Sequence, residues 1–178
     1  MVLTKEGRKL FPKLEYQIEG LIKTESYILC VQFRRVDNFR YIFLNGKWLE
    51  AGPGEPITAV KSVNHHDQPI RTGEKWMNGI VSFDKIKITN SPSESIYYVQ
   101  LHSMHKYRPV LLIYRLLMNE AHLVAIYSKS YTDFIAVTAY QNQRIIELKV
   151  DKNPFAKGFR EGNDRKKSIH SSKFYYFE

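Results

Sequence analysis

Cysteine is nearly absent from the chain. Cys30 is the only one among 178 residues, which excludes an internal disulfide and a zinc site made of several thiolates. It lies in the apolar run YILCVQF, where a buried and unreactive thiol is expected rather than a nucleophile. Apolar runs of membrane-spanning length are missing too, and the opening MVLTKEGRKLF lacks a signal-peptide core. These absences predict a soluble protein of a reducing compartment, with no membrane partner.

Acidic residues are in short supply relative to basic ones. Twenty-seven Lys and Arg stand against eighteen Asp and Glu, which leaves a formal net charge of +9. A charge of this sign favours an acidic partner, with nucleic acid as the first expectation and an anionic membrane surface as the second. The alternative is a basic surface that serves only solubility.

Helical periodicity is scarce before residue 141, whereas strand patterns recur. KLEYQIEG alternates apolar and polar residues, and SYILCVQFRRV and FRYIFL are β-branched and aromatic. Asn45-Gly46 between FRYIFL and KWLE predicts a hairpin turn, because both residues tolerate positive φ. Residues 57–78 have weak periodicity and are expected to form a long connection. Eight or nine short strands without helical crossovers predict an all-β sandwich or barrel.

The C-terminal part has a different pattern. In QNQRIIELKVDKN, Ile145 and Leu148 fall on one helical face, and Asn142 is a suitable cap. Asn153-Pro154 is typical of the start of a second short helix. We therefore expect short C-terminal helices, followed by a polar and flexible tail.

Phe155 and Phe159 are four residues apart and share one face of that second helix. Lys157 and Arg160 add positive charge beside them, and the helix N-terminus after Pro154 has amides that can meet phosphate. An apolar wedge flanked by cations is suited to insertion into a DNA minor groove. On spacing alone, the other interpretation is that both rings dock the helix onto the sandwich.

Arg8 follows a glycine ahead of the first predicted strand, where a guanidinium can reach the O6 and N7 atoms of guanine. Other constellations predict no chemistry. His65-His66-Asp67 has no further ligand at metal-site spacing, His102 and His105 have no matching nucleophile, and Gly52-Pro53-Gly54 is not followed by the GK[ST] of a phosphate loop. We expect neither an enzyme nor a bound metal or cofactor.

Several long stretches in order resemble the signature of the T-box family of transcription factors. FIAVTAYQNQRIIELKVDKNPFAKGF carries the closest likeness, and LTKEGRKLFP is similar to the family's TKxGRRMFP. FRYIFLNGKWLEAGPGEP, GEKWMNGIVSFDKIKITN and LHSMHKYRP are similar to its RYxxxNGxWxxxGxxEP, GxxWMxxxVSFxKxKLTN and LNSMHKYxP stretches. The resemblance implies an immunoglobulin-like β-sandwich that closes toward a barrel and binds double-stranded DNA such as the half-site AGGTGTGA.

The resemblance also implies roles for particular residues, and it favours the wedge interpretation of the two phenylalanines. Arg8 matches the arginine that reads a guanine in the major groove. The positions expected to touch bases or a groove are Arg8, Lys149, Pro154, Phe155, Phe159 and Arg160. Weaker phosphate candidates are Lys9, Lys87, Lys106 and Lys157.

The chain departs from the family pattern at Ile146, where many members have a Thr, at Val110, where an Arg is usual, and at Lys9, which replaces the second Arg of GRR. These differences affect the expected site preference and any dimer on a palindrome. We expect a DNA-binding domain over residues 1–162 and a flexible tail over 163–178. The expected role is nuclear, with other transcription regulators as partners. The basic run Arg165-Lys166-Lys167 is a weak import signal, and a solvated tail explains it equally well.

Two other classes of function remain open from the residues. One is a protein-interaction module that has kept the fold while its DNA binding has weakened, which the residues at Ile146 and Val110 would permit. The other is a single-strand or RNA binder, although no aromatic ladder on a strand beside a basic groove is evident.

Overall fold

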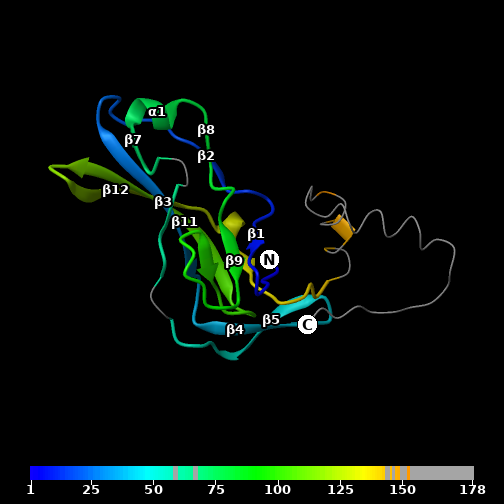
Figure 1. Ribbon diagram of the computed structural model, residues 1–178. Coiled ribbons are helices and arrows are strands. Elements are labelled where there is room, and N and C mark those ends of the chain that lie inside the picture. The colour runs from blue at the N-terminus through cyan, green and yellow to red at the C-terminus, as the bar shows by residue number, and fades with distance from the viewer. Residues whose placement is uncertain (58–59, 66–67, 143–144, 146, 149–151, 153–178) are drawn as a thin grey trace. The chain divides into compact units, whose positions relative to one another are not determined.

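The computed structural model describes residues 1–57, 60–65, 68–142, 145, 147–148 and 152. The chain divides into two compact units, Met1–Ala139 and Tyr140–Glu178, and each is considered by itself. The first unit is built almost entirely of strands (Figure 1). They are β1 (Arg8–Lys9), β2 (Glu15–Gln17), β3 (Ser26–Arg35), β4 (Phe39–Leu44), β5 (Lys47–Pro53), β6 (Val63–Asn64), β7 (Ile70–Thr72), β8 (Ile80–Ser82), β9 (Lys87–Thr89), β10 (Tyr98–Gln100), β11 (Lys106–Leu117), β12 (Glu120–Ser128) and β13 (Phe134–Ile135).

The largest sheet has the strand order β12-β11-β3-β6, with β7 paired to β3 and β13 paired to β11. Its centre is the long antiparallel pair of β3 and β11, which runs from Tyr107↔Arg35 to Arg115↔Tyr27. Three consecutive residues are buried, Leu29, Cys30 and Val31, so the middle of β3 is covered on both faces. This explains why the predicted strand has a continuous apolar run instead of strict alternation.

Smaller sheets complete the sandwich, one with the order β1-β9-β10 and one formed by β2 and β8. Core side chains of β3 pack with buried residues of these sheets, including Val81 of β8, Ile88 of β9 and Val99 of β10. Two layers around one apolar core are the arrangement of a β-sandwich. The predicted all-β, immunoglobulin-like fold is confirmed.

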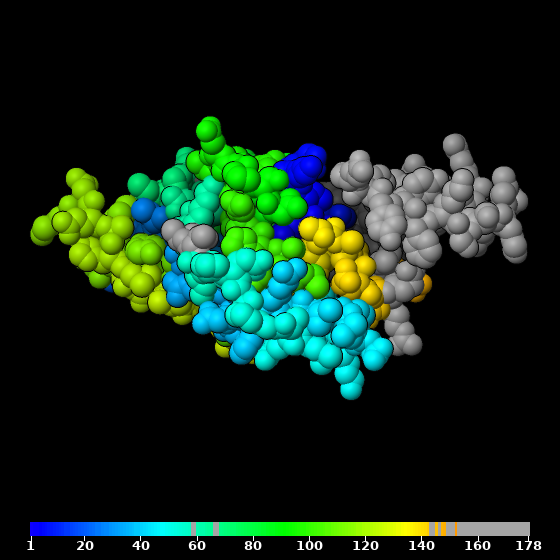
Figure 2. Space-filling view, turned by 90° about the horizontal axis from the view of Figure 1, so that it is seen from below, coloured from blue at the N-terminus to red at the C-terminus, as the bar shows by residue number. Residues whose placement is uncertain are grey.

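The β4–β5 hairpin confirms the predicted turn. Asn45 has φ +50° and Gly46 has φ +78°, as a two-residue turn of the hairpin type requires. Across the hairpin, the rings of Phe43 and Trp48 lie 5.2 Å apart between centroids. Figure 2 shows this hairpin (blue to cyan) spread over one face of the molecule.

The prediction of a long connection over residues 57–78 is wrong in part. β6, β7 and the helix α1 (Gly73–Met77) all fall within it. Thr72 caps α1, since its hydroxyl accepts from the Lys75 amide at 3.4 Å. Trp76 is completely buried and its indole N–H donates to the Tyr27 carbonyl at 3.0 Å. Strands of two and three residues are too short to produce a visible period, and contacts with β3 stabilise them.

Outside α1, the first unit has a short 3-10 helix, η1 (Ser130–Thr132). In the second unit, the described residues Ile145, Glu147, Leu148 and Lys152 are helical, as predicted for the segment after Asn142. The expected second helix and tail, and the expected boundary between residues 162 and 163, lie outside the described residues. Within the described part of the chain, no helix has the length and apolarity needed to cross a membrane.

Candidate nucleic-acid interface

Three of the basic candidates lie in the three-stranded sheet, and two of them share one of its faces. In the antiparallel pair of β1 and β9, Arg8 lies opposite Ile88 and Lys9 lies opposite Lys87. Residues directly opposite in such a pair project from the same face, so two ammonium groups share one side of the sheet. Figure 2 shows the N-terminal residues (blue) against the green segment that contains β9 and β10. Like charges at this spacing repel each other and attract an anion between them.

Tyr98 of β10 supports one of these lysines. It lies opposite Lys87 in the parallel pair of β10 and β9. The Lys87 ammonium donates a hydrogen bond of 2.9 Å to the Tyr98 hydroxyl. The same ammonium lies 5.1 Å from the centroid of the Tyr98 ring. These contacts fix the position of the Lys87 ammonium against the Tyr98 ring.

A tight turn orients Arg8. The Gly7 amide donates to the Thr4 carbonyl at 3.2 Å, and Gly7 has φ +72°. A Cβ atom added at Gly7 would lie 2.4 Å from Cε1 of Tyr98. Glycine is therefore required both by the backbone conformation and by the ring packed against it. Tyr98 thus contacts Lys87 and the residue immediately before Arg8.

Thr89 attaches the same turn to β9. Its side chain is fully buried, and its hydroxyl donates to the Thr4 carbonyl at 2.8 Å and lies 3.2 Å from the Lys5 carbonyl. The hydroxyl also accepts from the Ser91 amide at 3.0 Å. No sequence motif pointed to Thr89 as a functional residue. The one available signal was a polar residue at the end of KIKIT, which is equally typical of an exposed strand end.

Lys106 lies apart from this group, at the start of β11. Its ammonium donates to the Tyr41 hydroxyl at 2.9 Å and lies 3.7 Å from Oδ2 of Asp37. The Tyr41 hydroxyl in turn donates to Asp37 at 2.6 Å. The hydrogen bond to Tyr41 raises the pKa of Lys106. This lysine joins β11 to the β4–β5 hairpin, and it is a weaker phosphate candidate than Lys87.

His65 and His105 are buried within the sandwich, where they pack against neighbouring residues. His65 is buried, with its ring edge-on to Trp76 and Phe83. His105 is fully buried, its Nδ1 lies 2.8 Å from the Ser103 carbonyl, and burial lowers its pKa. Across the described residues, no group of three or more His, Cys, Asp or Glu side chains is arranged to hold a metal ion. His66 and Asp67 lie outside the described residues.

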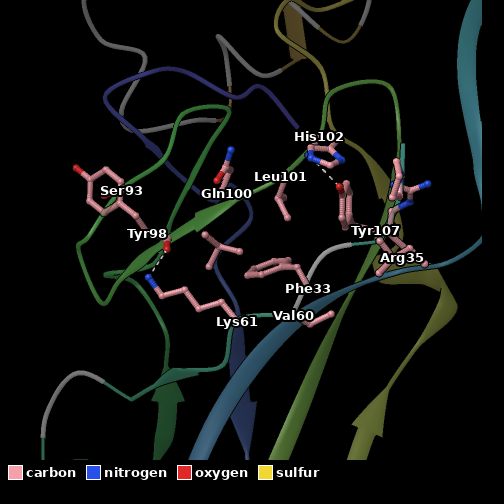
Figure 3. Close-up of a pocket in the computed structure, with 13 residues that line it drawn as sticks. Phe33, Arg35, Val60, Lys61, Ser93, Tyr98, Gln100, Leu101, His102 and Tyr107 are labelled. Atoms are coloured by element: carbon pink, nitrogen blue, oxygen red, sulfur yellow. Dashed lines mark hydrogen bonds between the residues drawn. The ribbon is translucent and has the colours of Figure 1, made fainter. Parts of the chain in front are cut away.

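A cavity of about 320 Å³ lies beside Tyr98 (Figure 3). Lys61 crosses it, and its ammonium donates to the carbonyls of Ser95 and Tyr98 at 2.6 and 2.8 Å. At the other side, the His102 amide donates to the Tyr107 hydroxyl at 2.9 Å. The Lys61 bonds tie the segment before β6 to β10, a strand of the sheet that contains Arg8. The His102–Tyr107 bond ties the segment after β10 to β11.

The remaining candidates cannot be placed. Lys149, Pro154, Phe155, Lys157, Phe159 and Arg160 lie outside the described residues. The described residues thus place Arg8, Lys9 and Lys87 in one small sheet, where Lys9 and Lys87 share a face and Arg8 projects from the other face. Lys106 lies in a different sheet.

Comparison with known proteins gives a consistent result. The sequence model of the T-box family matches residues 1–161. The chain is 43% identical over 97% of its length to "T-box transcription factor tbx-8" of Caenorhabditis elegans, covering 58% of that protein. It is 45% identical over 92% of its length to "T-box transcription factor tbx-9" of the same organism, covering 59%. For "T-box transcription factor mls-1", also of Caenorhabditis elegans, the identity is 44% over 90% of this chain and 64% of that protein.

The chain therefore spans about three-fifths of the length of these relatives. The family match covers both the β-sandwich and most of the C-terminal segment. With its sequence motifs, its sandwich fold and these relatives in agreement, the chain belongs to the T-box family.

Proposed function

We propose that this chain is the double-stranded DNA-binding domain of a nuclear transcription factor that recognises a duplex like AGGTGTGA. The observation that carries the proposal is the placement of Lys9 and Lys87 on one face of a small sheet, with Arg8 beside them in β1 and the preceding turn fixed by Gly7 and Thr89. A preorganised cationic site loses little conformational entropy when it binds phosphate. The net charge of +9 and the family membership point to the same partner.

Different residues have different roles in this proposal. Arg8 reads one guanine in the major groove through a bidentate pair of hydrogen bonds. Lys9 and Lys87 neutralise phosphate, as Lys106 and Lys157 do more weakly, and these contacts supply affinity rather than sequence preference.

The C-terminal segment contributes a second contact. Phe155 and Phe159 enter the minor groove as an apolar wedge and Pro154 lines that groove. Lys149 and Arg160 contact the DNA at the same groove. The two phenylalanines read the width and deformability of the groove rather than base edges.

At the level of the whole protein, the proposed activity is regulation of genes transcribed by RNA polymerase II. Palindromic sites would then recruit two copies, and further regulators would bind segments outside this domain. This domain has Ile146 and Val110 where other family members have Thr and Arg. Its preferred DNA sequence therefore differs from that of those members.

The test is fluorescence anisotropy of the domain on an AGGTGTGA duplex and on a scrambled duplex, each at two salt concentrations. We expect the specific duplex to bind more than about tenfold more tightly, and both affinities to fall as salt rises. Equal affinities would contradict sequence reading and would favour the protein-interaction alternative.

The Arg8→Ala variant sharpens this test. Loss of the bidentate contact is expected to cost about 1–3 kcal/mol of binding free energy and to relax discrimination at one base pair. Lys23→Ala is the matched control, because it removes one positive charge from an exposed turn remote in sequence from β1. Full preference for that guanine in the Arg8→Ala variant would show that Arg8 has another role.

A further inference from the structure

The loop of residues 90–97 joins β9 to β10 and contains Ser91-Pro92, the only place in the chain where proline follows a serine or a threonine. Proline has no amide hydrogen, and it restricts the residue before it to extended conformations. Protein kinases of the proline-directed class accept a serine before proline, because their substrate cleft has no acceptor for the amide hydrogen that any other residue would bring. Two residues alone are a weak signal, so the surroundings of Ser91 decide whether it is a modification site.

Ser91 lies in an exposed stretch of this loop. It is half-buried itself, and its neighbours are exposed, namely Asn90, Pro92, Ser93 and Glu94. Its amide donates to the Thr89 hydroxyl at 3.0 Å, so the residue is held through its main chain. Among the described residues, none forms a hydrogen bond with the Ser91 hydroxyl. That hydroxyl is therefore the group that a kinase can reach.

The later part of the loop is anchored to the sandwich. The Lys61 ammonium and the Tyr98 amide both donate to the Ser95 carbonyl, at 2.6 and 3.2 Å. Ser93 lines the cavity beside Tyr98 (Figure 3). Residues 90–94 can enter a kinase cleft without breaking the bonds at Ser95.

Ser91 is joined to the turn that precedes Arg8. The Thr89 hydroxyl that accepts from the Ser91 amide also donates to the Thr4 carbonyl at 2.8 Å and lies 3.2 Å from the Lys5 carbonyl. Two hydrogen bonds in series place the Ser91 amide within about 6 Å of the Thr4 carbonyl. Lys5 is exposed in this turn, so an anion on Ser91 would attract its ammonium.

The register of β9 gives the distance from Ser91 to the basic candidates for DNA contact. Arg8 lies opposite Ile88, and Lys9 lies opposite Lys87. Ser91 follows Ile88 by three residues, which corresponds to about 10 Å of extended chain. The Debye length is also about 10 Å at 0.1 M ionic strength, so a charge on Ser91 is only partly screened at β1.

We propose that Ser91 is a phosphorylation site of a proline-directed protein kinase, and that its phosphate weakens DNA binding by this domain. The second half rests on the DNA-binding function proposed above. In the transfer, a kinase base accepts the hydroxyl proton and the Ser91 oxygen bonds to the γ-phosphorus of ATP, while the bond from that phosphorus to the β–γ bridging oxygen breaks and ADP leaves. The product has a charge of about −1.5 to −2 at pH 7 and three acceptor oxygens.

The new charge acts on DNA binding in two ways, and both lower the affinity. It repels the DNA phosphates that approach Lys9 and Lys87, and it competes for the Lys5 ammonium. By Coulomb's law, two charges on Ser91 and one DNA phosphate about 10 Å away in water lower the affinity about fourfold before screening. Several phosphates approach the site and salt screens each of them, so we expect a loss of about threefold to tenfold.

Ser93 is the matched comparison within the same loop. It is exposed, lies two residues from Ser91, and is followed by Glu94 instead of proline. Its hydroxyl accepts from the Ser95 amide at 3.3 Å. A kinase that required only an exposed serine would modify both residues, whereas a proline-directed kinase modifies Ser91 alone.

The first experiment offers the folded domain and Mg-ATP to two proline-directed kinases, one cyclin-dependent and one mitogen-activated, with a peptide of residues 85–97 in parallel. Mass spectrometry locates the phosphate. We expect Ser91 to be phosphorylated in the domain and in the peptide, and Ser93→Ala to leave the reaction unchanged. Pro92→Ala keeps the serine and should slow the reaction strongly.

The other outcomes contradict the site. Phosphate on the peptide alone would show that the fold hides Ser91, and phosphate on neither would show that Ser91-Pro92 is not a substrate. Equal rates for Pro92→Ala and the unmodified domain would show that proline does not direct the reaction.

The second experiment measures the effect on DNA. Ser91→phosphoserine is made during translation, with Ser128→phosphoserine as the control, because Ser128 is exposed in β12 of another sheet. Anisotropy on the AGGTGTGA duplex should show a loss of about threefold to tenfold for the change at Ser91, smaller at the higher of two salt concentrations. The change at Ser128 should cost less than about twofold.

An unchanged affinity after the change at Ser91, or equal losses at both positions, would overturn the second half of the proposal. If the unmodified domain did not prefer this duplex to a scrambled one, the proposed DNA-binding function would be contradicted instead. The kinase experiment would still decide whether Ser91 is a modification site.

The pH dependence separates charge from a disturbed loop. The second pKa of phosphoserine is about 6, so its charge falls toward about −1 near pH 5 and the loss of affinity should shrink there. The unmodified domain at each pH is the reference, which cancels the titration of other groups. A loss of equal size above and below this pKa would show that the bulk of the phosphate, and not its charge, weakens DNA binding.

Discussion

At the scale of single residues, glycines with the same backbone conformation have different surroundings. Gly7 and Gly46 have φ +72° and +78°. A Cβ atom at Gly7 would meet the Tyr98 ring, whereas nothing lies within 4 Å of a Cβ atom at Gly46. Comparing the two positions therefore separates backbone strain from steric overlap.

Gly46→Ala is expected to lower the free energy of unfolding by about 1–2 kcal/mol through left-handed backbone strain alone. Gly7→Ala should lower the free energy of unfolding by about 1–3 kcal/mol more than Gly46→Ala does, because the ring of Tyr98 must move. It should also weaken DNA binding, since the same turn orients Arg8, while Gly46→Ala should not. Urea unfolding and duplex anisotropy measure both quantities, and equal effects of the two variants would contradict the role assigned to Tyr98.

Cys30 gives a second prediction at this scale. It is buried in β3, and burial raises the pKa of its thiol. Because the thiolate is the reactive form, the folded domain should react with a thiol-specific disulfide reagent at least about a hundredfold more slowly than the urea-unfolded chain. As the only cysteine, it reports opening of the central β3–β11 pair without background. Rapid labelling in native buffer would contradict the burial.

At the scale of elements, β9 joins the N-terminal segment to the sandwich. Thr4 forms an isolated bridge with Thr89, and the Thr89 hydroxyl binds both the Thr4 carbonyl and the Ser91 amide. Val has almost the same shape as Thr but has no hydroxyl. A valine at position 89 would leave the Thr4 carbonyl and the Ser91 amide without their hydrogen bonds to the hydroxyl.

Thr89→Val is accordingly expected to lower the free energy of unfolding by about 1–3 kcal/mol. It should also lower DNA affinity by loosening the turn before Arg8. Thr89→Ser keeps the hydroxyl and loses one methyl group, so its cost should be about 0.8 kcal/mol, with affinity retained. If Val and Ser behaved alike, packing rather than hydrogen bonding would be the function of Thr89.

At the scale of the whole molecule, the compact unit Met1–Ala139 contains the buried apolar core, from Val2 to Val137. Val137 closes this unit by pairing with Val2, and the Leu3 amide donates to the Val137 carbonyl at 2.7 Å. A sandwich whose two ends are joined in this way is expected to fold without the residues that follow.

A fragment ending at Ala139 should therefore unfold in a single cooperative urea transition and protect Cys30 as the full chain does. It should bind the AGGTGTGA duplex at least about tenfold more weakly, because six proposed DNA contacts, from Lys149 to Arg160, are missing. Unchanged DNA affinity would show that the C-terminal segment contributes no contact.

The double variant Phe155→Ala, Phe159→Ala tests the same segment in the full chain. It should weaken DNA binding while the thermal midpoint stays nearly unchanged, because the proposed wedge contacts DNA and not the sandwich core. A large fall in the midpoint would favour the other interpretation, in which both rings dock the helix onto the sandwich.

Much of this protein follows from local sequence. The β-branched and aromatic runs predict β3 and β4, and Asn45-Gly46 predicts the hairpin because its φ requirement is local. The helical pattern after Asn142 is likewise visible in the spacing of Ile145 and Leu148. Arg8 is a candidate from its place after a glycine, which is a weak local signal that the family resemblance strengthens. Lys9 and Lys87 are candidates through the resemblance alone, since single lysines have no distinctive local pattern.

Only the tertiary structure decides which distant residues meet. β6, β7 and α1 are too short for a period and depend on pairing with β3 and on the burial of Trp76. The roles of Thr89 and Tyr98 and the separation of Lys106 from Lys87 depend on contacts between segments far apart in the chain. Local propensity and charge fix which elements form, whereas the packing of one sheet against another fixes which side chains share a site.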